Sequence, residues 1–483
     1  MKNPLLIFVL LFLATNSLLS QSSAQTDAKT DISEIDKLMQ YSYENGMFNG
    51  DILITEQGKP IYKKALGYAD KNSGRKLNNE TVFYLASVSK QFTTMAIMIL
   101  KEQNKLSYDD LLSKYFPEFP AYADSVTIKQ LMTHTSGIPD HYRLGIYKKG
   151  LSNDDVLEIL LKQEHLNFKP GDQFSYSNGG YVLLSLIVEK ASETPFPEFM
   201  KTNIFEPLGM KNTLVYDKST PEINNRAVGY NLEGGLDDYE IFTTGAGGMY
   251  STLDDLHLWD QALYTEKLVS KSTLDEAFTS ATLKNGDSTH YGYGWAVSDD
   301  KGQKVVQHSG SLSGYRTFLR RNVYNNSGYI ILTNYGSAYN DLAIREALNN
   351  ILEGKPYTMP KIPISRKLAQ MLKSDDTASV IKEIHVLLDS EPDKYEADEY
   401  GINPLGYTYL ANQDMEKALA VFKLNVDYFP KSFNVYDSYG EALMKNNEIE
   451  KAIINYRKSV ELNPNNMNGI EMLKKLEAMV EKD

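Results

Sequence analysis

The hexapeptide at residues 85–90, Leu-Ala-Ser-Val-Ser-Lys, constrains the fold of this chain more than any other stretch. The apolar segment 92–100 follows at once and predicts a buried helix that begins near Ser87. A helix places Ser87 and Lys90, three residues apart, on one face within reach of each other. A serine hydroxyl becomes a good nucleophile only when a neighbouring base takes its proton. Burial and the positive potential at a helix N-terminus both lower the pKa of a lysine toward neutrality, so that it can act as that base. The stretch therefore predicts a serine nucleophile with lysine as its base.

The Ser-x-x-Lys pattern is weak evidence by itself. Three other copies occur in this chain, at Ser73/Lys76, Ser298/Lys301 and Ser379/Lys382. Acyl transfer also requires a second proton-handling group, an oxyanion hole and a wall that orients the substrate. The residues that accompany the motif therefore decide its meaning.

Two further motifs are candidates for these parts. Tyr176-Ser177-Asn178 follows a Lys-Pro-Gly-Asp turn and is expected in a short loop, where a tyrosine can relay protons and an asparagine amide can bind a substrate carbonyl. The second motif is expected to end a strand and comprises His308, Ser309 and Gly310. Its glycine would let a substrate lie along the strand edge as another strand. The backbone N–H groups of Ser87 and Ser311 are then expected to point at the oxyanion.

The composition excludes several classes of function. The formal net charge is -13, without a basic run of five residues, so nucleic-acid binding is not expected. The chain has no cysteine, which excludes disulfides, thiol catalysis and a lipid anchor on a signal cysteine. Residues 1–24 are typical of a secretory signal, with Lys2 before an apolar stretch and small residues before Gln25. The mature protein is expected to be exported, periplasmic or extracellular, without a stable membrane span.

Hydrophobic periodicity predicts an α+β domain at residues 32–353. The predicted helices are 32–45, 87–104, 127–134, 151–163, 181–191, 253–264 and 340–353, and the predicted strands are 51–56, 59–65, 81–85, 294–297, 305–308, 317–322 and 328–333. The late strands are spaced as an antiparallel meander. The predicted sheet therefore takes strands from both ends of the domain.

Residues 366–483 are expected to form an all-α domain of tetratricopeptide repeats, joined through a linker at 354–365. The pairs that lie 34 residues apart are Gly406/Gly440, Ala418/Ala452, Phe422/Tyr456 and Pro430/Pro464. A 34-residue period with small residues at the helix crossings and a proline after the second helix is typical of these repeats. A protein partner is expected for the repeats, and residues 467–481 are expected to cap them.

Together, the motifs resemble the serine penicillin-binding protein and β-lactamase superfamily on its class C side, which carries Tyr-x-Asn as the second element. The order matches: Ser-x-x-Lys heads a buried helix early, Tyr-x-Asn lies in a loop, and His-x-Gly ends a late strand. Residues 131–139, Leu-Met-Thr-His-Thr-Ser-Gly-Ile-Pro, and the glycine-rich stretch 244–252 also look like this family. The other Ser-x-x-Lys copies lack this context. The resemblance covers roughly residues 32–353.

The resemblance implies a β-lactamase-like antiparallel sheet flanked by helices, with a helical lobe beside it. It implies Ser87 as the nucleophile, Lys90 as its base and Tyr176 as the proton relay. The substrate-binding residues that it implies are Asn178, His308, Ser309, Gly310 and Ser311. It implies no metal and no cofactor.

His308 departs from the β-lactamase pattern, because most β-lactamases have lysine there. A neutral imidazole holds a substrate carboxylate less well than an ammonium group. Some carboxypeptidases and many esterase-like members of the family share the histidine. The resemblance therefore implies a D-amino-acid peptidase, carboxypeptidase or esterase that forms an acyl-enzyme, and a true β-lactamase is the alternative. An alternative of another class is an inactive hydrolase fold that binds protein partners through its repeats. The acyl donor, the acceptor and the oligomeric state stay open.

Overall fold

The computed structural model describes residues 30–231, 234–238, 240–300, 302–336 and 338–480. The predicted signal peptide, residues 1–24, lies outside the described residues. No helix in the described part of the chain is both long enough and apolar enough to cross a membrane.

A six-stranded antiparallel sheet is the centre of the N-terminal two thirds of the chain. Its strands are β1 (Gly50–Glu56), β2 (Lys59–Leu66), β8 (Ala296–Asp300), β9 (Gln303–Leu312), β10 (Tyr315–Asn322) and β11 (Ser327–Thr333). They lie in the order β2-β1-β11-β10-β9-β8. The N-terminal hairpin joins the late meander where Ile52 pairs with Ile331. The predicted sheet with strands from both ends of the domain is therefore confirmed.

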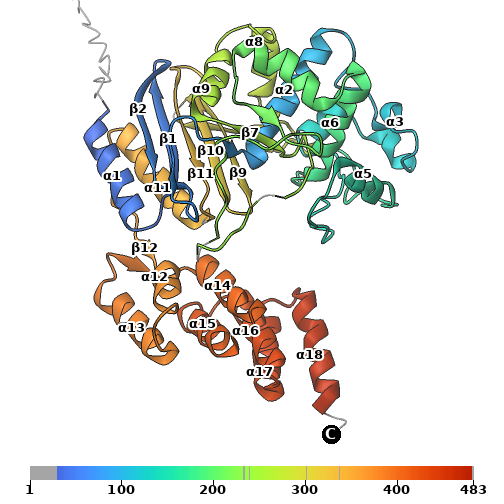
Figure 1. Ribbon diagram of the computed structural model, residues 1–483. Coiled ribbons are helices and arrows are strands. Elements are labelled where there is room, and N and C mark those ends of the chain that lie inside the picture. The colour runs from blue at the N-terminus through green and yellow to red at the C-terminus, as the bar shows by residue number, and fades with distance from the viewer. Residues whose placement is uncertain (1–29, 232–233, 239, 301, 337, 481–483) are drawn as a thin grey trace, which may run out of the picture.

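Helices cover both faces of this sheet (Figure 1). On one face, α1 (Ile32–Glu44) and α11 (Ala338–Leu352) lie side by side and share an apolar cluster with β1 and β11. The helical lobe covers the other face. Central strands are therefore buried on both sides, and almost every residue of β1 and β11 is buried instead of every second one.

The helical lobe is built around α2 (Lys90–Glu102) and α6 (Asn178–Ser192). Residues 90–100 of α2 are all buried, so this helix runs through the core. Helix α6 begins at Asn178, three residues before the start predicted from the sequence. The Ser177 hydroxyl caps it by accepting from the Gly180 N–H at 3.1 Å. A Cβ at Gly179 would stand 2.7 Å from the carbonyl oxygen of Pro139, so the helix start requires a glycine there.

The lobe and its connections hold further short elements. The helices are η1 (Ala86–Ser89), α3 (Leu112–Tyr115), η2 (Ala121–Ser125), α4 (Ile128–Met132), α5 (Asn153–Leu161), α7 (Phe196–Met200), η3 (Lys201–Phe205), α8 (Glu206–Leu208), α9 (Leu253–Ala262) and α10 (Lys271–Ala277). The short strands are β3 (Tyr68–Asp70), β4 (Arg75–Lys76), β5 (Phe83–Tyr84), β6 (Leu214–Val215) and β7 (Met249–Ser251). Strand β5 leads the chain directly into η1, so the strand pairing fixes where η1 begins.

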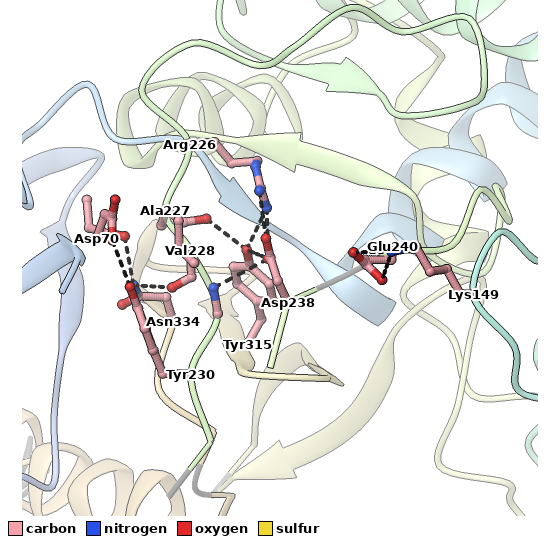
Figure 2. Close-up of polar contacts among 12 residues, drawn as sticks. Asp70, Lys149, Arg226, Ala227, Val228, Tyr230, Asp238, Glu240, Tyr315 and Asn334 are labelled. Carbon is pink, nitrogen blue, oxygen red and sulfur yellow. Dashed lines mark hydrogen bonds and ion pairs between the residues drawn. The ribbon is translucent and has the colours of Figure 1, made fainter. Parts of the chain in front are cut away.

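A polar network ties the segment that begins at Arg226 to the end of the sheet (Figure 2). The Arg226 guanidinium binds both carboxylate oxygens of Asp238 at 2.8 and 2.6 Å. The Tyr315 hydroxyl lies 2.6 Å from the same carboxylate and 2.7 Å from the carbonyl oxygen of Ala227. The Tyr315 ring packs against Tyr84 of β5, with centroids 5.6 Å apart. This network therefore supports β5, which leads into residues 85–90.

The C-terminal part of the chain is helical. Its elements are β12 (Ile362–Pro363), α12 (Ile364–Met371), α13 (Thr377–Ser390), β13 (Tyr395–Glu396), α14 (Glu399–Ala411), α15 (Met415–Tyr428), α16 (Phe433–Lys445), α17 (Ile449–Leu462) and α18 (Met467–Val480). Each repeat brings a glycine of its first helix against a ring of its second: a Cβ at Gly406 would stand 2.6 Å from Phe422, and one at Gly440 would stand 3.1 Å from Tyr456. The 34-residue period therefore places equivalent contacts in both repeats.

The end of the predicted linker differs from the expectation. β12 and the start of α12 lie inside residues 354–365. Ile362 is 5 % exposed and belongs to the apolar cluster between the sheet, α1 and α11. The Pro and Gly residues of this stretch indicated a linker, whereas long-range burial of Ile362 attaches its end to the sheet domain.

Candidate active site

Ser87 lies in the short helix η1, at the entry to α2. The preceding residue, Ala86, has a φ of 48°, in the left-handed region that residues with a Cβ rarely adopt. Backbone of this kind persists only where surrounding contacts hold it, and it is concentrated at functional sites. The Leu85 carbonyl, one residue earlier, accepts from the Thr317 hydroxyl of β10 at 2.7 Å. The sheet therefore anchors the turn that presents Ser87.

Lys90 is fully buried, and its Nζ lies 3.1 Å from the Ser87 Oγ. Nζ also donates to the Asn178 Oδ1 at 2.8 Å and to the Ala246 carbonyl at 2.7 Å. Burial lowers the pKa of Lys90 from 10.5 to about 7, and the charge of Asp140 partly opposes this shift. The lysine can therefore lose and regain a proton near neutral pH.

The surroundings of Nζ decide which of its three protons leaves. The two carbonyl oxygens, from Asn178 and Ala246, can only accept hydrogen bonds, so they hold two N–H groups of the neutral amine. The remaining tetrahedral position faces the Ser87 hydroxyl, which can donate. Deprotonation therefore directs the amine lone pair at the Ser87 hydroxyl proton.

Tyr176 lies beside this pair, with its ring centroid 4.8 Å from the Lys90 Nζ. Burial raises the pKa of Tyr176, and its hydrogen bond with Ser87 lowers that pKa by a smaller amount. The phenol therefore keeps its proton at neutral pH and can donate it. The ring packs against His134 at a centroid distance of 4.2 Å, and the His134 Nδ1 accepts from the Ser177 N–H at 3.1 Å. These contacts hold Tyr176 in place.

Asn178 connects Lys90 to a carboxylate that the sequence reasoning missed. Asp140 accepts from the Asn178 Nδ2 at 2.9 Å and from the Asn178 backbone N–H at 3.2 Å. Because Nδ2 faces this carboxylate, Oδ1 faces Lys90. One Nδ2 hydrogen remains for a substrate carbonyl, as the predicted role of Asn178 requires. Asp140 directly follows the Thr-Ser-Gly-Ile-Pro stretch that resembled the family, and that position was the available signal.

The Ala246 carbonyl is a second contact that the sequence did not reveal. The glycine-rich stretch 244–252 packs closely, since a Cβ at Gly245 would stand 2.2 Å from the Tyr181 carbonyl and one at Gly247 would stand 2.5 Å from the Tyr84 hydroxyl. The same close approach brings the Ala246 carbonyl to Lys90.

His308 lies inside β9 and does not end the strand as predicted, because β9 continues to Leu312 through its pairing with β10. Strand β8 pairs with β9 only as far as Gln307. Among the described strands, residues 308–312 therefore have a partner on one side only, which leaves an edge there. Ser309 and Ser311 are exposed, whereas His308 and Gly310 are buried, as strand alternation dictates.

Gly310 has a packing reason that the sequence reasoning did not foresee. A Cβ there would stand 2.2 Å from both the Leu85 carbonyl and the Thr317 Oγ1, and 3.1 Å from the Ala86 Cβ. The glycine therefore lets β9 approach the turn that carries Ser87. The oxyanion hole formed by the Ser87 and Ser311 N–H groups stays a prediction.

His308 has protein partners at both ring nitrogens. Its Nδ1 lies 2.7 Å from the Ser309 carbonyl, and its Nε2 lies 2.9 Å from the Tyr291 hydroxyl. Burial, together with the charge of Lys90, lowers the pKa of His308 to about 3. The imidazole is therefore neutral at physiological pH. Tyr291 is a further site residue that the sequence reasoning missed, since nothing local marks it.

The described residues contain no group of three or more His, Asp or Glu side chains arranged to hold a metal ion. The groups that the structure brings together at the site described above are a serine hydroxyl, a buried amine and a phenol.

Residues 34–350 match the Beta-lactamase family. The chain belongs to this family. Residues 433–466 match the Tetratricopeptide repeat. Both parts of the predicted architecture, a β-lactamase-like domain followed by tetratricopeptide repeats, are therefore confirmed, and membership of the β-lactamase family implies serine hydrolase activity.

Relatives of this β-lactamase family chain include penicillin-binding proteins and a hydrolase. Penicillin-binding protein 4* of Bacillus subtilis (strain 168) is 36 % identical over 362 residues, covering 69 % of this chain and 78 % of the relative. The octameric penicillin-binding protein homologue from Pyrococcus abyssi is 28 % identical with a TM-score of 0.60, covering 71 % of this chain and 81 % of that one. EstCE1, described as a hydrolase with promiscuous acyltransferase activity, is 25 % identical with a TM-score of 0.55, covering 65 % of this chain and 97 % of that one.

Proposed function

We propose that this protein is an exported serine hydrolase that forms an acyl-enzyme on Ser87 and acts on D-amino-acid peptides, amides or esters. The observation that carries the proposal is the contact between the Ser87 Oγ and the buried Lys90 Nζ, whose two other hydrogen bonds go to carbonyl oxygens. That arrangement is suited to removing the serine proton. The relatives named above include penicillin-binding proteins and a hydrolase with acyltransferase activity, which supports acyl transfer.

In the proposed acylation, the neutral Lys90 amine takes the Ser87 hydroxyl proton while Oγ forms a bond to the substrate carbonyl carbon. The bond from that carbon to the leaving nitrogen or oxygen then breaks. The leaving group takes up a proton from the Tyr176 phenol, and the Lys90 ammonium reprotonates the tyrosine. In deacylation, a water molecule attacks the ester carbon, and its proton passes to Lys90 through Tyr176. The bond from that carbon to the Ser87 Oγ then breaks, and Oγ takes the proton back from the Lys90 ammonium.

Substrate recognition is proposed along the open edge of β9. The exposed Ser309 and Ser311, together with the remaining Asn178 N–H, offer neutral hydrogen-bonding groups to a substrate backbone. A dedicated β-lactamase is the alternative, and an inactive scaffold is the alternative of another class. The complete set of Ser87, Lys90 and Tyr176 argues for an active enzyme.

The test is intact-mass spectrometry of the protein after incubation with a serine-reactive phosphonate and, separately, with benzylpenicillin. The matched variants are Ser87→Ala and Ser89→Ala, since Ser89 lies next to Lys90 in sequence and its buried hydroxyl has no partner among the described residues. We expect one phosphonate on the wild type and on Ser89→Ala, and none on Ser87→Ala. Equal labelling of Ser87→Ala, or no labelling of the wild type, contradicts the acyl-enzyme proposal.

The benzylpenicillin arm separates the two enzymatic alternatives. A lasting adduct on the wild type supports a penicillin-binding, peptidase-like enzyme. Rapid consumption of penicillin without an adduct instead identifies a β-lactamase, because the acyl-enzyme then hydrolyses quickly. Neither adduct nor consumption, together with phosphonate labelling, directs the search to D-amino-acid amides and esters.

Export and partner binding are proposed from separate features. Residues 1–24 support export, and N-terminal sequencing of the secreted protein is expected to begin at Gln25. The tetratricopeptide match supports a protein partner for the C-terminal helices. A truncated chain for a pull-down should end after Pro363, because Ile362 packs in the cluster beside the sheet. Equal recovery of partners by the full and truncated chains contradicts the partner proposal.

A further inference from the structure

The hydrogen bonds of His308 determine which of its nitrogens carries the proton. A carbonyl oxygen can only accept, so the Nδ1 that lies 2.7 Å from the Ser309 carbonyl must carry a hydrogen. The Nε2 of a neutral ring is then an acceptor, and the Tyr291 hydroxyl at 2.9 Å is the group that can donate to it. Burial raises the pKa of Tyr291, so this phenol keeps the proton that it donates.

The other groups around His308 favour the same state. Lys90 is the cation that faces it, and a second positive charge on His308 would be unfavourable in this buried place. The remaining ring neighbours are Tyr176, at a centroid distance of 6.3 Å, and Tyr291, at 5.8 Å. His308 itself is only 7 % exposed. Its ring therefore presents neither a charge nor an N–H group to a ligand.

We infer that Tyr291 is a positioning residue that keeps the Nε2 of His308 unprotonated, while the Ser309 carbonyl holds the Nδ1–H. The site then selects amides and esters over substrates that carry a free carboxylate beside the scissile bond. The inference rests on the proposed function, because it concerns the substrate class of that same site. Tyr291 acts through His308 and takes no part in the bond changes at Ser87. The loss of a charged hydrogen bond to a substrate carboxylate corresponds to roughly a 10- to 100-fold loss in kcat/KM for such substrates.

The test compares two substrates that differ in one group: N-acetyl-D-alanyl-D-alanine and its C-terminal amide. We expect the wild type to favour the amide by about tenfold or more in kcat/KM. Tyr291→Phe removes the donor to Nε2 while the Ser309 carbonyl still holds the Nδ1–H, so Nε2 becomes free to take up a proton and to meet a substrate carboxylate. We therefore expect the preference for the amide to fall several-fold, mainly through a lower KM for the carboxylate substrate.

Tyr293→Phe is the matched control. Tyr293 is also a buried tyrosine and lies two residues from Tyr291 in sequence. Its ring packs against Tyr108, with centroids 5.4 Å apart, and not against His308. We expect it to keep the wild-type preference. Equal kcat/KM of the wild type for both substrates, or the same preference in Tyr291→Phe and Tyr293→Phe, overturns the inference.

A spectroscopic measurement keeps the test independent of turnover. Nitrogen NMR of histidine-labelled protein, with the His308 signals assigned by their loss in His308→Gln, reports the tautomer directly. We expect a protonated Nδ1 and an unprotonated Nε2 in the wild type at neutral pH, and an Nε2 that takes up a proton at higher pH in Tyr291→Phe than in the wild type. A protonated Nε2 in the wild type overturns the inference. Failure of the proposed function differs from failure of this inference. If the proposed function is wrong, phosphonate does not label Ser87, but the NMR measurement still reports the tautomer of His308.

Discussion

Replacing Lys90 with methionine tests the buried amine most directly. Burial lowers the pKa of Lys90 from 10.5 to about 7, which is a difference of 10.5 − 7 = 3.5. Each pKa unit corresponds to 1.36 kcal/mol, so burying this lysine lowers the free energy of unfolding by about 5 kcal/mol below pH 7, where it is protonated in both the folded and the unfolded chain. Between pH 7 and 10.5 the unfolded chain binds more protons than the folded one, so stability rises with pH in that window. By pH 9 the remaining cost is about 2 kcal/mol.

The pH dependence is more informative than the absolute change. Lys90→Met removes the cost of burial, but it also leaves the Asn178 Oδ1 and the Ala246 carbonyl without their donor. Each unsatisfied buried acceptor costs about 1–3 kcal/mol, so the net change at pH 6 is small or modestly stabilising. The signature is that the wild type gains about 3 kcal/mol of unfolding free energy between pH 6 and 9, and Lys90→Met lacks this gain.

The assay is urea denaturation at several pH values, followed by tryptophan fluorescence. The chain has two tryptophans, and both Trp259 and Trp295 are buried in the β-lactamase-like part, so the signal reports that part alone. Lys105→Met is the control, because Lys105 is exposed. We expect the control to follow the wild-type pH dependence. A Lys90→Met variant that gains as much stability as the wild type between pH 6 and 9 refutes the reasoning.

Four further outcomes are expected. The rate of phosphonate labelling should rise with pH through a midpoint near 7, since the proposed mechanism uses the neutral Lys90 amine. A rate that is flat from pH 5 to 9 contradicts this. Asp140→Asn should move that midpoint to lower pH, because the carboxylate raises the pKa of Lys90; an upward shift in the same labelling assay argues against this reading. Gly406→Ala should destabilise the repeats by about 1–2 kcal/mol, because overpacking against Phe422 exceeds the gain in helix propensity. Gly440→Ala should be nearly neutral, because its contact is looser; circular dichroism of urea unfolding compares the two, and a larger loss for Gly440→Ala contradicts the packing argument.

The parts of the site that could be predicted are those that are local in sequence. Ser87 and Lys90 are three residues apart, so helical geometry alone places them together. Asn178 is 88 residues from Lys90 and Ala246 is 156 residues away. Tyr-x-Asn was recognisable as a motif, but an alanine carbonyl carries no side-chain signal. Backbone groups that complete a site are therefore invisible until the fold brings them in.

The surroundings of His308 in β9 were also beyond prediction from local sequence. The sequence pattern indicated a strand over residues 305–308, and Gly310, just beyond it, is a residue type that is depleted in strands. The structure extends β9 to Leu312, since pairing with β10 overrides that local preference. Whether His308 is charged depends on burial and on Tyr291, which no spacing rule connects to it.

By itself, the sequence determined the two-part architecture, the antiparallel sheet built from both ends of the first part, and the serine–lysine pair at the head of a buried helix. These follow from periodicity and short spacing, which act within a few residues along the chain. Only the tertiary structure decided the pKa of Lys90, the role of Asp140, the extent of β9 and the tautomer of His308. Each of those depends on burial and on partners from distant segments, because solvation and hydrogen bonding act through space and not along the sequence.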